Sequence, residues 1–247
     1  MPFIRRATMK GQITLPLPFP DPAQDFVYSQ IQDPHQQRHV IWETVAKRME
    51  LIWKHVAHCV YSEIPGFSKE SRSSGVYWYQ YRNPPPPRVY VFAEFTPTRK
   101  FQSLIGMPIP KPRQFRVEGG LSLRLALLPP NPHLGHPTSV DIRLFSERAL
   151  PVKSLLAAWD QSRDVLARLI ETANAKVCFG DLLEEHPEPY ALDHYHLATS
   201  RKHRVDFVCE LTQITEVSSI TIPVLALARI YHAIQGFVRG DPTRLSR

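Results

Sequence analysis

GVYWYQYRNPPPPRVYVFAEFT, residues 75–96, is the stretch that decides the fold. It holds two runs rich in β-branched and aromatic residues, 75–82 and 88–96, which are separated by Asn83 and four consecutive prolines. Such runs are typical of β-strands, whereas proline has no amide hydrogen to give to a strand ladder. The sequence therefore predicts two strands that pair antiparallel across a rigid loop.

Working outward from this pair, the hydrophobic pattern predicts further strands and three helices. Strands are expected over residues 12–17, 121–127, 140–145 and 204–213. Apolar residues that recur every three or four positions indicate helices over residues 34–62, 151–174 and from about 221 to 240. Asp33 followed by Pro34 is a typical helix start, and Gly240 is a typical helix stop.

This order of elements predicts an α+β fold: a largely antiparallel sheet with two to three packed helices and long proline-rich loops. The opening strand-helix-strand-strand portion is compatible with a ferredoxin-like unit. One division of the chain is 1–128, which holds that unit and the basic aromatic loop, and 129–247, a strand-helix-strand-helix unit. The pattern is equally compatible with one continuous domain.

The charge of the chain is concentrated in one segment. The 247 residues carry a formal net charge of +7, and residues 69–124 hold ten basic and three acidic side chains, which accounts for the whole excess. Seven of the ten are arginines, which favours planar recognition of phosphate. Glycine is scarce, with 10 residues against 24 prolines, which argues against glycine-rich phosphate loops.

Aromatic residues are interleaved with these cations, and nucleic-acid binding needs both kinds of side chain. Alternation along residues 77–81 places the three tyrosines on one face of a strand and Trp78 on the other. The residues expected to contact nucleic acid are Arg72, Tyr77, Tyr79, Tyr81, Arg82, Arg88, Arg99, Lys100, Lys111, Arg113, Arg116, Arg201, Lys202 and Arg204. Two other interpretations remain open: aromatic strand formers with a soluble arginine edge, and a surface that grips another protein.

In the order of its elements alone, the chain is similar to the sheet-based RNA-binding folds, which include the RNA-binding subunits of CRISPR effector complexes. No motif matches residue by residue, so the resemblance carries no site residues over. It implies a nucleic-acid-binding subunit of a larger nucleoprotein complex, with RNA favoured over DNA and other subunits as partners. A CRISPR-type effector, and hence a role in antiviral defence, is one example.

The histidines offer a different hypothesis, a metal-independent endoribonuclease. His194, His196 and His203 lie close in sequence to Arg201–Arg204, and imidazole is suited to general acid and base work near neutral pH. A metal site is the weaker alternative: His35, His39 and Glu43 are four residues apart and share one side of the first helix. No cofactor is expected.

The cysteine residues and the N-terminal sequence indicate in which cellular compartment the protein is expected. Three widely spaced cysteines give no disulfide framework, and prolines interrupt the N-terminus before any long apolar run. We therefore expect a cytoplasmic protein. Only residues 220–238 approach membrane length, but Arg229, His232 and Gln235 interrupt them, which favours a buried core helix over a membrane contact.

Overall fold

The computed structural model describes residues 15–21, 30–81, 88–98, 121–128, 138–146, 149–180, 184–195 and 204–238. Within these ranges eight strands form one sheet in which every neighbouring pair is antiparallel. The strands are β1 (Ser71–Ser73), β2 (Tyr77–Tyr81), β3 (Arg88–Pro97), β4 (Leu121–Leu128), β5 (Ser139–Ser146), β6 (Lys176–Gly180), β7 (Glu184–His186) and β8 (Arg204–Leu211). The predicted α+β fold with an antiparallel sheet is confirmed.

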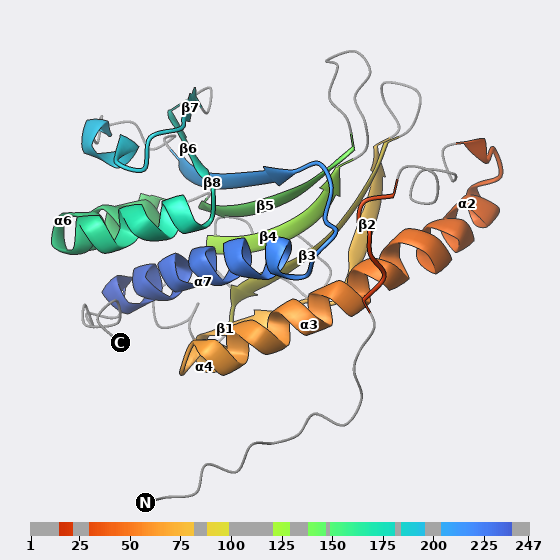
Figure 1. Ribbon diagram of the computed structural model, residues 1–247, viewed down its shortest axis with the longest axis horizontal. Coiled ribbons are helices and arrows are strands. Elements are labelled where there is room, and N and C mark those ends of the chain that lie inside the picture. Colours follow the sequence, from red (N-terminus) through yellow and green to blue (C-terminus); the bar gives the residue numbers. More distant parts are fainter. Residues whose placement is uncertain are drawn as a thin grey trace, which may run out of the picture.

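The strand order is β1-β3-β4-β5-β8-β6-β7, and β2 pairs with β3 on the same side as β1. The helical elements are α2 (Pro34–Ile41), the π-helical turn η2 (Trp42–Ala46), α3 (Lys47–Glu63), α4 (Phe67–Glu70), α6 (Ala149–Thr172), the 3₁₀ turn η3 (Ala191–His194) and α7 (Ser218–Val238). Figure 1 shows α3, α7 and α6 side by side along one face of the sheet. The three predicted long helices are therefore present.

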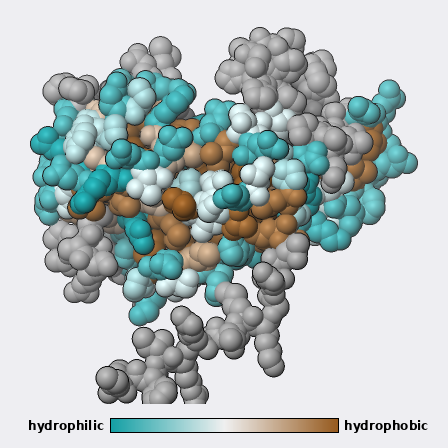
Figure 2. Space-filling model, in the orientation of Figure 1, coloured by the Kyte–Doolittle hydropathy of each residue, from teal (hydrophilic) through white to brown (hydrophobic). Residues whose placement is uncertain are grey.

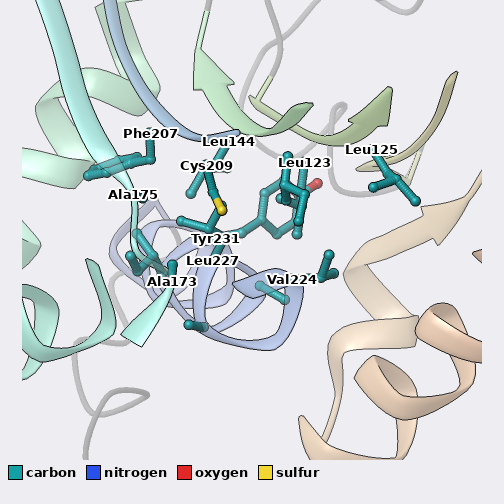
Figure 3. Packing of buried hydrophobic residues seen from close by; sticks show 14 of the residues in the cluster. Leu123, Leu125, Leu144, Ala173, Ala175, Phe207, Cys209, Val224, Leu227 and Tyr231 are labelled. Carbon is teal, nitrogen blue, oxygen red and sulfur yellow. The ribbon is translucent and has the colours of Figure 1, made fainter. Parts of the chain in front are cut away.

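The core lies between this helical layer and the sheet. Alternate residues of β4 and β5, such as Leu123, Leu125 and Leu144, are fully buried beneath the helices. Helix α7 is central, because it contacts α3, α6, β4 and β5. Its Tyr231 is completely buried, and Figure 3 shows the ring beside Leu123.

Helix α7 is also the one described helix long and apolar enough to cross a membrane by length and composition. Two thirds of that stretch, 67%, is buried inside the protein, as expected of a core helix. Figure 2 shows that some apolar surface remains along α7 and beside α3. The exposed large apolar side chains of these two helices are Leu51 and Ile222.

The edge of the sheet at β1 and β2 is irregular. Ser73 pairs with Phe95 and Tyr77 with Phe92, so three residues of the edge strand lie opposite two of β3. This is a β-bulge. Ser74 bridges it, because its amide donates to the carbonyl oxygen of Glu94 at 2.8 Å and its hydroxyl accepts from the Glu94 amide at 2.9 Å.

Some sequence expectations differ from the structure. The strand expected over 12–17 is not formed at Leu15–Leu17; instead Phe19 makes an isolated antiparallel bridge with Ile214. Strands β1, β6 and β7 were not predicted. The division at residue 128 stays a prediction, although β4 and β5 on either side of it pair along eight residues.

Alanine substitutions at two phenylalanines of β3 should have different effects on stability, because the two side chains lie on opposite faces of the sheet. Phe95 is fully buried, with its ring centroid 4.7 Å from that of Trp53, 5.2 Å from Phe67 and 5.7 Å from Tyr61. Phe95→Ala should lower the free energy of unfolding by about 3–5 kcal/mol. Phe92→Ala, on the other face, should cost roughly 1–2 kcal/mol because Phe92 is only partly buried. Urea unfolding measures both, and equal losses would contradict the assignment of faces.

Candidate functional site

The sheet has a second face, which the described helices do not cover. Because strand side chains alternate, burying Val91, Ala93 and Phe95 under the helices places Phe92 and Glu94 on this opposite face. We call it the helix-free face. The described residues on it include Arg72, Tyr77, Phe92, Glu94, Arg124, Ala126, Asp141, Arg143, Phe145, Lys176, Cys178, Asp206, Val208 and Glu210.

A row of aromatic rings and one guanidinium crosses four strands of this face. The Tyr77 ring on β2 lies 5.9 Å from that of Phe92 on β3. The Arg124 guanidinium on β4 lies 4.6 Å from the centroid of Phe92 and 4.8 Å from that of Phe145 on β5. We call these four residues the aromatic-arginine row. Tyr77 is 41% exposed, whereas Phe145 is buried, so the row opens to solvent at its β2 end.

Arg124 is held in this position by a carboxylate as well as by the rings. Its Nε and one terminal nitrogen donate to Glu94 Oε2 at 3.0 and 2.9 Å. Cation–π contacts and paired hydrogen bonds both fix a planar guanidinium in one orientation. One third of the Arg124 side chain, 33%, remains exposed, so it can still meet a ligand.

Trp78 explains why Tyr77 points outward. Trp78 packs partly buried against the core on the helical side, and its ring lies 5.7 Å from that of Trp42 in the π-helical turn. The predicted division of this strand into a core-facing and an outward-facing side therefore holds at residues 77 and 78.

Beyond Arg124 the helix-free face becomes acidic. Arg143 on β5 lies 3.2 Å from an oxygen of Asp141 and 3.5 Å from an oxygen of Asp206 on β8. Glu210 is the cross-strand neighbour of Asp141 and is exposed. Burial raises the pKa of the nearby Cys178 thiol to about 11, so it is not ionised at neutral pH. We call Asp141, Arg143, Asp206 and Glu210 the acidic cluster.

Asp141 is the most perturbed carboxyl of this cluster. Only 7% of the residue is exposed, and its Oδ1 has no hydrogen-bond partner among the described residues. Burial raises its pKa from 3.8 to about 6, against the opposing effect of Arg143. Glu210 and Asp206 raise this pKa further, and Arg124 lowers it. Asp141 therefore changes charge close to neutral pH.

The structure describes only part of the predicted nucleic-acid site. Arg72 and Tyr77 are exposed on the helix-free face. Four further positions belong to strands, with side chains outside the described part: Tyr79, Tyr81, Arg88 and Arg204. The others lie outside the described residues altogether: Arg82, Arg99, Lys100, Lys111, Arg113, Arg116, Arg201 and Lys202.

The histidine hypotheses gain no support from the described residues. Asp193, beside the predicted cluster, accepts a hydrogen bond from Trp159 Nε1 at 2.8 Å and one from Arg163 at 3.1 Å, so it anchors η3 to α6. The His194 side chain, His196 and His203 lie outside the described part.

At the suggested metal site, His35, His39 and Glu43 are exposed, and no group of three or more such ligands gathers among the described residues. Glu43 instead accepts a hydrogen bond from Lys47 at 2.8 Å, which lowers the pKa of the Glu43 carboxyl.

Sequence reasoning did not single out Arg124, Arg143, Asp141, Asp206 or Glu210 as site residues. A signal for them exists, because charged residues alternate with apolar ones in 140–145 and in 204–211. Their meeting depends on β5 pairing with β8, which no local pattern reveals.

The chain was compared with protein-family models, with curated proteins and with solved structures, and none of them matches it.

Replacing Asp141 tests the electrostatics of the acidic cluster. The folded state binds this proton more tightly than the unfolded chain, so stability falls as the pH rises from about 4 to about 6. A shift of two pKa units corresponds to about 3 kcal/mol. Asp141→Asn, which cannot ionise, should therefore stabilise the protein at pH 7.5 by up to that amount and by only about a third of it at pH 4.5.

Urea unfolding at the two pH values measures this difference. Asp160→Asn, an exposed carboxylate on α6, is the matched control and should change stability little at either pH. The same stability change for Asp141→Asn at both pH values would contradict the raised pKa of Asp141.

Proposed function

We propose that this protein binds single-stranded nucleic acid, with RNA as its ligand, across the β2–β4 half of the helix-free face. The observation that carries the proposal is the aromatic-arginine row, in which the exposed Tyr77 ring continues into Phe92 and Arg124. Unstacked bases lie on aromatic faces and on guanidinium planes, and RNA is recognised mostly where its bases are unpaired.

The position of the basic segment supports the same proposal. Strand β3 is ten residues long, about 33 Å at the usual rise. Arg82 precedes its first residue in the chain, and Arg99 and Lys100 follow its last. Cations therefore flank, in the sequence, the strand that carries Phe92, and they are the side chains expected to contact the phosphates of a bound strand.

The acidic cluster limits where the ligand would lie. Three carboxylates around Arg143 oppose a polyanion on the β5–β8 half of the face. A strand lying over β2, β3 and β4 meets the aromatic rings and approaches the acidic cluster only at its border with β5, where Arg143 lies opposite Arg124. Membership of a larger nucleoprotein complex, with other subunits as partners, is part of the proposal and rests on the order of elements alone.

Tyr77 tests the stacking surface. Tyr77→Ala should weaken binding of a fluorescently labelled single-stranded oligouridylate by about 5- to 150-fold, the effect of losing about 1–3 kcal/mol of base stacking. Tyr77→Phe should bind like the wild type because it keeps the ring. The measurement is fluorescence anisotropy at fixed salt.

Tyr190→Ala is the matched control for Tyr77→Ala. Tyr190 is similarly exposed, 44% against 41%, but it lies against Trp159 of α6, away from the helix-free face. It should leave affinity unchanged. Equal losses at Tyr77 and Tyr190, or no binding by the wild type at all, would overturn the proposal; the latter would favour a protein partner for this surface.

Salt dependence tests the phosphate contacts. If about five phosphates of a single strand are contacted, the logarithm of the association constant should fall against the logarithm of salt concentration with a slope of roughly −3.5. Replacing Arg82, Arg99 and Arg113 by glutamine should flatten that slope by about 0.7 for each lost contact. A slope near zero, or one unchanged by all three replacements, would contradict the electrostatic part of the proposal.

A further inference from the structure

Arg124 and Arg143 lie directly opposite each other on β4 and β5. Side chains at such positions have Cβ atoms about 5 Å apart, and like charges there destabilise a sheet. Each side chain is partly exposed, 33% for Arg124 and 34% for Arg143, although Arg143 Nε itself is buried. Two partly exposed arginine side chains that start from directly opposite positions can hold one phosphate between them.

The two arginines differ in how their charge is balanced. Arg124 has one carboxylate partner, Glu94, at 2.9 Å. Arg143 has two, Asp141 at 3.2 Å and Asp206 at 3.5 Å, and Glu210 stands beside Asp141. When all of these carboxylates are ionised, the Arg143 side of the pair carries an excess of negative charge that opposes a phosphate.

Asp141 is the carboxylate able to relieve that excess. Within the described part of the chain its Oδ1 has no hydrogen-bond partner, so a proton can be added there without breaking any hydrogen bond that the structure shows. The charged groups that face Asp141 are Arg124 from β4, Arg143 from β5, and Asp206 and Glu210 from β8. Its pKa of about 6 lies in the range where a nearby added negative charge would increase protonation at neutral pH.

We infer that Arg124 and Arg143 together bind one phosphate of the nucleic-acid strand, and that Asp141 takes up a proton when this phosphate binds. The inference rests on the proposed function and adds to it a specific phosphate position and a dependence on pH. Protonation of Asp141 removes one negative charge from beside Arg143, and the bound phosphate in turn favours protonated Asp141, since the coupling is reciprocal. Affinity therefore rises as the pH falls.

The test is the affinity for labelled oligouridylate from pH 5 to pH 8 at constant ionic strength. Wild-type affinity should fall about tenfold over this range, a usual size for coupling between two sites. Asp141→Asn should lack this fall and bind about tenfold more tightly than the wild type at pH 8. Asp160→Asn, the control on α6, should show the wild-type profile, including any part due to histidines.

Glu210→Gln provides a second variant, because Glu210 is exposed and its removal should leave folding intact. Glu210 raises the pKa of Asp141, so this variant should shift the pH dependence to lower pH. Identical pH profiles for the wild type, Asp141→Asn and Glu210→Gln would overturn the inference while leaving the proposed function standing. Absence of oligouridylate binding at every pH would instead overturn the proposed function itself.

Discussion

The packing of helix α7 against the middle of the sheet is the interaction on which the rest of the structure depends. Leu227 and Tyr231 are completely buried, and α7 contacts β4 and β5 below it and α3 and α6 on either side. Burying a large apolar side chain contributes about 1.5–3 kcal/mol. Covering one sheet face in this way also determines what the other face carries, because successive strand residues point in opposite directions.

That constraint explains why charged residues occur in the middle of central strands. In β4, Arg124 lies between the buried Leu123 and Leu125, and in β5, Arg143 lies between the buried Ile142 and Leu144. Once the leucines face α7, the arginines can only face the other way. Each guanidinium then needs a neighbouring carboxylate, because partly buried charge is costly without a partner.

Much of the fold could be predicted from local patterns. The three long helices repeat apolar residues every three or four positions, and the aromatic runs around the proline stretch form β2 and β3 as expected. Strand β7 could not be predicted, because it is three residues long and reads Glu-Glu-His, and β6 was missed although it is as long as β2. Pairing with β8 defines β6, and pairing with β6 defines β7.

The candidate site likewise has one part that the sequence predicts and one part that it does not. The outward orientation of Tyr77 could be predicted, because Tyr77 and Trp78 are neighbours in one short strand and therefore point to opposite faces. Arg124 contacts Phe92 and Phe145 only because of strand register, and Asp206 reaches Arg143 only because β8 pairs with a strand some sixty residues earlier in the chain. Such neighbours are set by the tertiary structure, so a single sequence without its fold does not reveal them.

The bulge between β1 and β2 has a consequence for how molecules meet one another. Strands β1 and β2 form one edge of the described sheet, and an exposed sheet edge can pair with another extended chain. At the bulge the Ser74 hydroxyl, and not a backbone carbonyl, accepts the hydrogen bond from the Glu94 amide. The extra residue shifts the register of β2 on β3 by one residue relative to that of β1. A straight incoming strand can therefore pair with the three residues of β1 or with the five residues of β2, but it cannot pair with both strands in one register. The aromatic surface is thus displayed on an edge that is poorly suited to growth of an intermolecular sheet.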